Sequence, residues 1–209
     1  MNRAVLLTQL RKEYPAVEGT ALHYSTALDL LVAAILSAQC TDDRVNAVTK
    51  ALFVKYRTPF DYVQAPTEAL EAVIRPTGFY QRKARLIQAA AKRLIEEFHS
   101  EVPSTMEALT RLPGVARKTA NIVLSNAFNV VEGIAVDTHV LRLARRLGLS
   151  HQKIREKIER DLMNAFDKAD WFELSNLLIA HGRRVCVARR PRCEACVLRV
   201  LCPSAYKHK

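Results

Sequence analysis

Four cysteines near the end of the chain have the spacing of a metal-ligand set. They follow the pattern Cys-x6-Cys-x2-Cys-x5-Cys, and four arginines stand between the first and the last of them; the cysteines are Cys186, Cys193, Cys196 and Cys202. Thiols this close in sequence either pair as disulfides or gather around a metal. The two arrangements belong to different cellular compartments, so the rest of the sequence decides between them.

Features of the whole chain favour a metal. At 209 residues the chain is long enough to bury a core without disulfides. Its N-terminal segment carries charged residues by position 11 and lacks the continuous apolar core of a signal peptide. The longest apolar-rich run, 27–38, is interrupted by Asp29 and is too short to span a bilayer. We therefore expect a protein of a reducing cytoplasm with no membrane partner, in which clustered cysteines more often bind metal or act in redox chemistry than form structural disulfides.

The segment LPGVARKTANIVL, residues 112–124, has the pattern of a helical hairpin. Pro113 and Gly114 end one helix, and the next begins near Arg117 after a tight turn. Such a turn is expected to leave the backbone N–H groups of residues 115–117 unpaired, where they suit a phosphate. Contacts of this kind bind nucleic acid without reading its sequence. A plain connection between two helices is the alternative, and the basic residues behind the turn favour the phosphate.

The charge of the chain is positive and uneven. The formal net charge is +11, and residues 181–209 carry eight lysines or arginines against one acidic residue. Residues 75–93 hold six basic residues and no acidic one. This bias favours nucleic acid as a partner, ahead of an anionic membrane surface or an acidic protein.

Helices must position these residues, because apolar side chains recur every three or four positions in segment after segment. Strand alternation is not evident, and the apolar segment 130–136 is expected to be a buried connector. We predict helices at about 3–12, 25–37, 42–56, 67–74, 80–98, 105–111, 117–127, 138–147, 152–166 and 171–182.

Two helix starts carry clear capping chemistry. Ser104 with Glu107 predicts a capping box at the first helix of the hairpin. Asp137 predicts an N-cap for the helix that follows it, and Gly148 predicts the end of that helix.

Together, these motifs resemble the endonuclease III family of DNA repair glycosylases. An aspartate in VDTHVLRLARRLG follows nineteen residues after the hairpin lysine, and the cysteine pattern comes next. LSAQCTDDRVN (36–46) and GFYQRKARLI (78–87) are similar to segments of that family and stand in the same order. The resemblance covers nearly the whole chain, and the joint pattern is far more specific than any single motif.

The resemblance implies an all-α fold of two helical lobes with a DNA cleft between them. One lobe is a helical barrel domain of residues 22–131 that contains the helix-hairpin-helix. The other is an iron-sulfur cluster domain made of residues 1–21 and 132–209. A monomer is the simplest expectation for such a protein.

The resemblance assigns the four cysteines to a [4Fe–4S] cluster. Four thiolates satisfy such a cluster, but they bind zinc equally well, and spacing alone does not separate the two. A metal-closed loop would hold its arginines toward phosphates, although a loop that only fastens the C-terminus would leave them solvated. Cys40 lies outside this group and is expected to be a buried small apolar residue.

The implied substrate is double-stranded DNA with a damaged base or an abasic site. A damaged base must leave the stack before it can react, and apolar or flat polar side chains fill the gap. The resemblance places Gln39 in that gap and Phe79 near a second wedge position, where the family often has leucine. Both also fit ordinary structural roles, as a polar residue at a helix end and as a core aromatic. The expected DNA contacts are Gln39, Phe79, Gly114, Val115, Ala116, Arg117, Arg189 and Arg190.

The hairpin itself departs from the commonest family pattern, because Ala116 stands where glycine is usual. Alanine tolerates positive φ poorly. The change is harmless if residue 116 lies in the helical region, and phosphate binding would weaken if it does not. We expect the helical region.

The resemblance makes Lys118 the nucleophile and Asp137 the catalytic carboxylate. A neutral amine can attack the sugar C1′, expel the base and leave a Schiff base that permits β-elimination. A fixed carboxylate can stabilise the positive charge that develops on the sugar and help to deprotonate the lysine. By spacing alone, Lys118 would be a solvated charge and Asp137 only a helix cap. His139 is expected to be structural.

The predicted function is a bifunctional DNA glycosylase and abasic-site lyase that excises oxidised pyrimidines in base excision repair. An adenine-specific mismatch glycosylase is the nearest alternative, but it lacks the hairpin lysine and usually carries a further C-terminal domain. A non-catalytic zinc or iron-sulfur module that binds DNA is the alternative from another class. It predicts binding to a duplex without a covalent adduct.

Overall fold

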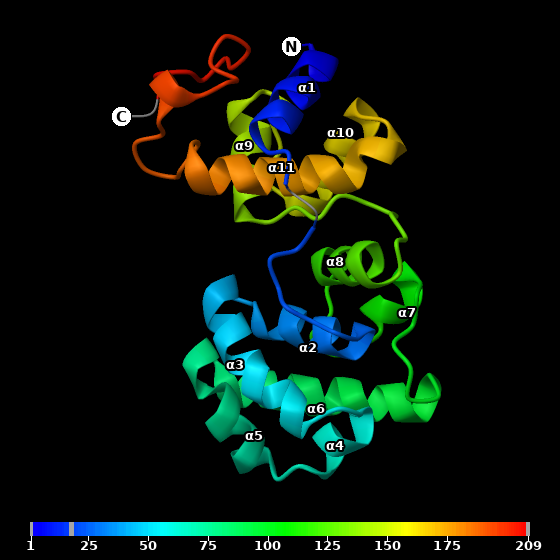
Figure 1. The fold of residues 1–209 in the computed structure, drawn as a ribbon. Coiled ribbons are helices and arrows are strands. Elements are labelled where there is room, and N and C mark those ends of the chain that lie inside the picture. Colours follow the sequence, from blue (N-terminus) through cyan, green and yellow to red (C-terminus); the bar gives the residue numbers. More distant parts are fainter. Residues whose placement is uncertain (1, 17–18, 208–209) are drawn as a thin grey trace. The chain divides into compact units, whose positions relative to one another are not determined.

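The computed structural model describes residues 2–16 and 19–207, and every regular element within them is a helix (Figure 1). The chain divides into two compact units, Thr20–Glu132 and Met1–Gly19 with Gly133–Lys209. The predicted all-α class is confirmed, and residues 130–136 form a connector without a strand, as expected.

The longest helix of the unit Thr20–Glu132 is α6. Helix α6 packs against α4, α5 and α2, while α2 also packs against α3 and α8. The elements are α2 (Ala27–Leu36), α3 (Asp42–Lys55), α4 (Pro59–Gln64), α5 (Thr67–Ile74), the 3₁₀ helix η1 (Arg75–Thr77), α6 (Tyr80–Glu97), α7 (Met106–Thr110) and α8 (Arg117–Ala127).

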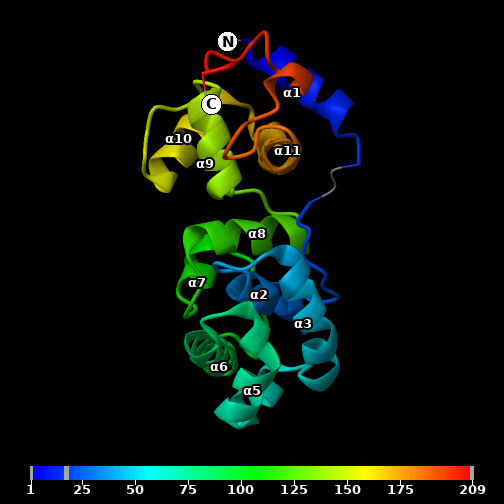
Figure 2. The same cartoon turned by 90° about the vertical axis from the view of Figure 1, so that its left-hand side faces the viewer.

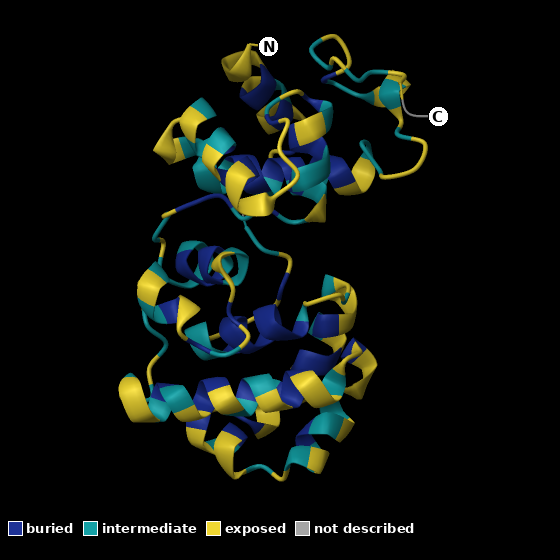
Figure 3. Cartoon of the chain, turned by 180° about the vertical axis from the view of Figure 1, so that it is seen from behind, coloured by how far each residue is buried: buried dark blue, intermediate teal, exposed yellow. Residues whose placement is uncertain are grey.

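Helix α2 is the centre of this unit. All of its residues from Asp29 to Leu36 are buried, which Figure 3 shows as an almost continuous buried ribbon. Asp29 lies in this apolar helix because it completes a capping box: Thr26 accepts a hydrogen bond from the backbone of Asp29, and the Asp29 carboxylate accepts one from Thr26. Each fully buried leucine of α2 stabilises the unit by roughly 1.5–3 kcal/mol.

The second unit is built on α11, against which α9 and α1 pack, as the end-on view of α11 in Figure 2 shows. Helices α9 and α11 approach closely at Gly182, where an added Cβ would lie 2.9 Å from the Cβ of His139. The elements are α1 (Arg3–Glu13), α9 (Thr138–Arg146), α10 (Arg155–Ala165), η2 (Lys168–Asp170), α11 (Trp171–Arg184) and η3 (Cys193–Ala195).

Three details of the helix prediction were wrong. The short helix α4 was missed, although Thr58 and Asp61 form a capping box around its N-terminal Pro59. Helix α7 is capped by Thr105 instead of Ser104, and the hydrogen bond from the backbone of Ala108 goes to the Thr105 side chain. Helix α10 begins at Arg155, three residues later than expected.

Candidate functional site

The hairpin between α7 and α8 closes on a glycine. Gly114 has φ of +82°, a left-handed conformation that an L side chain rarely adopts. A Cβ there would also lie 3.3 Å from the Cβ of Leu86 and 3.6 Å from the Cγ2 of Ile35. The turn therefore requires glycine for its backbone conformation and for its close packing on α6 and α2.

Helix α8 begins directly after the hairpin turn. Its N-cap, Ala116, has φ −86° and ψ 167° and provides no side-chain hydrogen bond. The first amides of a helix have no acceptor within the helix, and they lie at its positive end. Residue 116 is thus extended instead of helical, which corrects the expectation. Alanine is unstrained there because φ is negative.

Val115 differs from the expected pattern of unpaired amides. Its N–H donates to the carbonyl of Leu112 at 3.1 Å, and its side chain is buried. The prediction that the amides of residues 115–117 are all unpaired was therefore wrong at Val115, since the hairpin turn uses this donor to close itself.

Lys118 is the second residue of α8, and its side chain is partly buried. Arg117, one position earlier, is exposed. The hairpin therefore presents an amine within one helical turn of its open N-terminus.

The two expected wedge residues stand on separate turns of the same unit. Gln39 is exposed and has φ of +54°, just after α2. Phe79 is 64% exposed and has φ of +49°, just before α6. Neither residue belongs to the core. The ordinary structural role of a core aromatic therefore does not apply to Phe79.

Asp137 caps α9 with one of its two carboxylate oxygens. Oδ1 accepts hydrogen bonds from the backbone N–H of His139 at 2.7 Å and of Val140 at 2.8 Å. Both capping bonds fall on Oδ1, which leaves Oδ2 for a different partner. The predicted N-cap is confirmed, as is the end of the helix at Gly148, whose φ is +67°.

The four cysteines of the C-terminal segment line one cavity. The cavity has an open volume of about 420 Å³, and side chains of α9 and α11 complete its wall. All five cysteines of the chain are free thiols. The cysteines that share the cavity are Cys186, Cys193, Cys196 and Cys202.

Side chains of α9 and α11 contact two of these sulfurs. Arg146 of α9 donates from Nη1 to the Sγ of Cys186 at 3.3 Å. The ring of His181 lies between two partners: Nδ1 is 2.8 Å from the hydroxyl of Tyr14, and Nε2 is 3.3 Å from the Sγ of Cys196. Burial lowers the pKa of His181 to about 4, so the ring is neutral and can accept from Tyr14 while it donates to sulfur.

The cavity disfavours bare thiolates. Burial raises the pKa of the Cys196 thiol to about 11, and negative charge on Cys186, Cys202 and Cys193 contributes to this increase. Burial also raises the pKa of Cys202. Four thiolates are stable together only around a positively charged group, and they release their protons when it binds.

The number of thiols bears on the kind of group that this cavity could hold. Within residues 2–16 and 19–207, no three His, Cys, Asp or Glu side chains form a group that could hold a single metal ion. A [4Fe–4S] cluster needs one thiolate at each of its four irons. The four cysteines that line the cavity supply that number.

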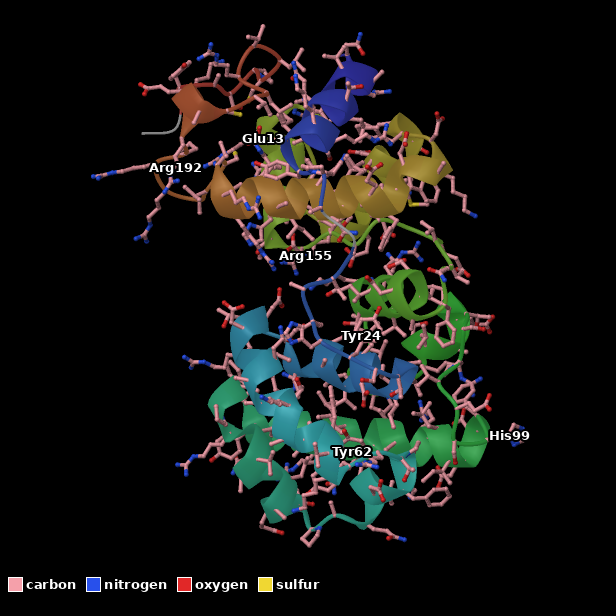
Figure 4. All side chains as sticks on the ribbon, viewed as in Figure 1. Glu13, Tyr24, Tyr62, His99, Arg155 and Arg192 are labelled. Carbon is pink, nitrogen blue, oxygen red and sulfur yellow. The ribbon has the colours of Figure 1, made fainter. Side chains whose placement is uncertain are left out.

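The loop with the expected phosphate contacts is tied to α9. Arg146 donates to the carbonyls of Val187 at 2.8 Å and Ala188 at 2.9 Å. Arg189 and Arg190 follow directly, and both are exposed. Arg192, labelled in Figure 4, is exposed on the same loop.

Comparison with known proteins decides the family. Residues 32–168 match the family described as HhH-GPD superfamily base excision DNA repair protein. The chain is 50% identical over 200 residues to the endonuclease III of Synechocystis sp., covering 96% of this chain and 91% of the relative.

The chain belongs to the endonuclease III family. Membership makes it an enzyme of base excision repair, a DNA glycosylase and lyase, as predicted. No helix among the described residues is long and apolar enough to cross a membrane.

Two solved endonuclease III structures match the fold closely. One is a non-covalent endonuclease III–DNA complex, and the other is a trapped endonuclease III–DNA covalent intermediate. Each has a TM-score of 0.93 and is 43% identical, and each match covers 98% of this chain and 95% of the other. A thermostable thymine-DNA glycosylase that is 22% identical shares the same fold, with a TM-score of 0.85.

Other residues of this endonuclease III family member were placed differently or missed. Cys40 is partly buried at the edge of the core, so the expectation of a buried residue was wrong. The Nδ1 of His139, which is expected to be structural, lies 3.0 Å from the Nη2 of Arg142 on the same helix. Sequence analysis missed His181 and the buried Lys83. Their only sequence signal is a polar residue on the apolar face of a helix, which many unimportant residues share.

Proposed function

We propose that this chain excises oxidised pyrimidines from double-stranded DNA and then cleaves the abasic strand, with Lys118 as the nucleophile. The observation that carries the proposal is the position of Lys118, the second residue of α8, on a hairpin whose open helix N-terminus suits a phosphate. An endonuclease III that is 43% identical to this chain has been trapped as a covalent intermediate with DNA, which supports covalent catalysis here.

In the proposed reaction, the Nζ of Lys118 forms a bond to the sugar C1′ as the bond from C1′ to the base breaks. The base leaves with a proton, and the sugar ring opens to an iminium between Lys118 and C1′. Loss of a proton from C2′ then expels the 3′ phosphate by β-elimination. Water hydrolyses the iminium and regenerates the amine.

Asp137 serves this reaction through its charge. The capping bonds to Oδ1 fix the carboxylate without consuming Oδ2. We assign Oδ2 to stabilising the positive charge on the sugar and to accepting a proton from Lys118. A preorganised anion of this kind stabilises charge without having to reorganise during the reaction.

Cys186, Cys193, Cys196 and Cys202 would hold a [4Fe–4S] cluster in the unit Met1–Gly19 with Gly133–Lys209, which we propose as the iron-sulfur domain. Their shared cavity and the donors from Arg146 and His181 support this assignment. Bound there, the cluster would close the loop, and Arg189 and Arg190 would contact phosphates.

The remaining DNA contacts are assigned to the other unit. The hairpin residues Gly114, Ala116 and Arg117 would hold a phosphate, while Gln39 and Phe79 would fill the gap left by an extruded nucleotide. We propose that the protein acts as a monomer on chromosomal DNA in the cytoplasm of a bacterial cell.

Borohydride trapping tests the nucleophile. The protein is incubated with a duplex that carries one thymine glycol, borohydride is added, and a covalent protein–DNA band is sought on a denaturing gel. We expect a band with the wild type and with Lys92→Ala, which removes an exposed lysine of α6. We expect none with Lys118→Ala, because only an iminium between this amine and the sugar is reduced to a stable bond.

Two outcomes would count against the proposal. A band of undiminished intensity with Lys118→Ala would assign the nucleophile to another amine. If the wild type bound the duplex but trapped neither with thymine glycol nor with an abasic site, the chain would lack lyase chemistry altogether.

A further inference from the structure

One buried cation of the unit Thr20–Glu132 has no part in the proposed reaction. Lys83, on the first turn of α6, is only 3% exposed. Its Nζ donates to the carbonyl oxygen of Leu36 at 2.7 Å and to that of Thr77 at 2.8 Å. Burial lowers the pKa of Lys83, because a charged group loses its hydration there. Burial of such a charge is tolerated only where hydrogen bonds compensate for the lost hydration, and these two carbonyls supply them.

The first of its two partners lies at the end of α2. Leu36 is the last residue of that helix, and the last carbonyls of a helix have no partner within it. They also lie at the negative end of the helix dipole, which favours a cation. The turn that follows Leu36 carries Gln39 at φ +54°.

The second partner lies in the turn before α6. Thr77 ends η1 and is followed by Gly78 at φ +69° and ψ 159°, and then by Phe79 at φ +49°. The backbone N–H of Lys83 also donates to the carbonyl of Phe79 at 3.0 Å. Lys83 therefore holds this turn with both its side chain and its backbone.

Both turns present an exposed side chain from a strained backbone. Positive φ is unfavourable for glutamine and for phenylalanine, and such a conformation persists only where the surroundings fix it. Gln39 is exposed, and Phe79 is 64% exposed. The ammonium of Lys83 donates to the carbonyl of Leu36, where the turn of Gln39 begins, and to the carbonyl of Thr77 in the turn of Phe79. It therefore links the backbones at the start of the two turns.

We propose that Lys83 is a positioning residue for nucleotide extrusion: it clamps the turns of Gln39 and Phe79 at the spacing that lets both side chains enter the base stack. The inference rests on the proposed function, because it takes these two side chains as the wedges. An apolar residue at position 83 would leave two carbonyl oxygens inside the protein without a donor.

The test compares a substrate that needs extrusion of a base with one that does not. In single-turnover assays, Lys83→Met is expected to slow excision of thymine glycol about tenfold or more, while cleavage at an abasic site stays within about threefold of wild type. A 2-aminopurine next to the lesion reports unstacking by its fluorescence. We expect the increase in 2-aminopurine fluorescence when the protein binds the duplex to be smaller with Lys83→Met than with the wild type.

Matched variants separate positioning from folding. Lys92→Met removes an exposed lysine of the same helix and should behave as wild type. Lys83→Arg keeps a cation with several donors and should restore part of the fluorescence rise. If Lys83→Met does not fold, Gly78→Ala replaces it. No atom lies within 4 Å of the added Cβ, so this variant strains the Phe79 turn through its positive φ alone. It should also slow excision of thymine glycol while leaving cleavage at an abasic site nearly unchanged.

Equal slowing on both substrates by folded variants would overturn the positioning role, and so would an unchanged rate and fluorescence rise in Lys83→Met. Either result leaves trapping by the wild type at Lys118 intact, so the proposed function stands. Absence of trapping with the wild type would instead remove the proposed function and this inference with it.

Discussion

Asp137 caps α9 and is also the proposed catalytic carboxylate. Two substitutions distinguish these two roles. Asp137→Asn keeps an oxygen for the two capping bonds, and asparagine caps helices about as well as aspartate. Its free energy of unfolding should stay within about 1 kcal/mol of wild type, the scale of the lost helix-dipole interaction. The rate of thymine glycol excision should fall by about 10²–10⁴-fold, since a charged acid–base group is lost.

Asp137→Ala is the companion variant. It should lose activity similarly and also lower the free energy of unfolding by about 1 kcal/mol, because the cap itself is gone. Urea unfolding and single-turnover excision measure the two effects. Near-wild-type excision by Asp137→Asn would reduce this residue to a helix cap.

At the scale of elements, the hairpin depends on the backbone conformation of one residue. Gly114→Ala places a Cβ at φ +82° and 3.3 Å from Leu86. We expect the free energy of unfolding to fall by about 1–2 kcal/mol, the cost of a left-handed alanine. Binding to an undamaged duplex should weaken as well, because the turn presents the N-terminus of α8. Thermal unfolding and fluorescence anisotropy measure these changes.

Ala116→Gly is the matched control for the hairpin. It introduces the residue that the family commonly has, at a position where φ is −86°. Because residue 116 is the N-cap of α8 and glycine is a better N-cap than alanine, the change should raise the free energy of unfolding by about 0.5–1 kcal/mol. Much tighter DNA binding by Ala116→Gly would contradict the view that the alanine is harmless.

The elements also show what a sequence can and cannot predict. Long helices such as α6 were predicted almost to the residue, because their apolar period extends over several turns. Helix α4 has six residues, which are too few to show a helical period, and its capping box is the only signal for it in the sequence. Thr105 caps α7 in place of Ser104. The sequence does not show which of two adjacent hydroxyl residues is the cap.

Some residues of the candidate site could be predicted from local sequence, and others could not. Asp137 was predicted as a cap because a cap is a local relation between a side chain and the next turn. The task of Lys83 was not predictable, because one of its partners, Leu36, is 47 residues away in the chain. The lysine shows its role only when the fold brings α2 against α6.

At the scale of the whole molecule, positive charge is a property of both units. Residues 75–93 bring six basic residues to one unit, five of them outside the core because Lys83 is buried, and residues 181–209 bring eight to the other. Neither unit is acidic in its candidate DNA-binding segment. Neutralising phosphates releases condensed counterions, so binding by such a molecule must respond to salt.

We expect the affinity for a duplex to fall steeply with salt. If the protein contacts about 6–10 phosphates, binding should weaken by about 10³–10⁵-fold between about 50 and 200 mM salt. The double variant Arg189→Gln/Arg190→Gln should lower the slope of log affinity against log salt by about 2, because each phosphate contact contributes about 1. Lys157→Gln/Arg160→Gln removes two exposed charges of α10, outside the assigned DNA contacts, and is the control. Equal slopes for the two double variants would show that Arg189 and Arg190 act only through net charge, and a flat salt response of the wild type would argue against phosphate binding as the source of affinity.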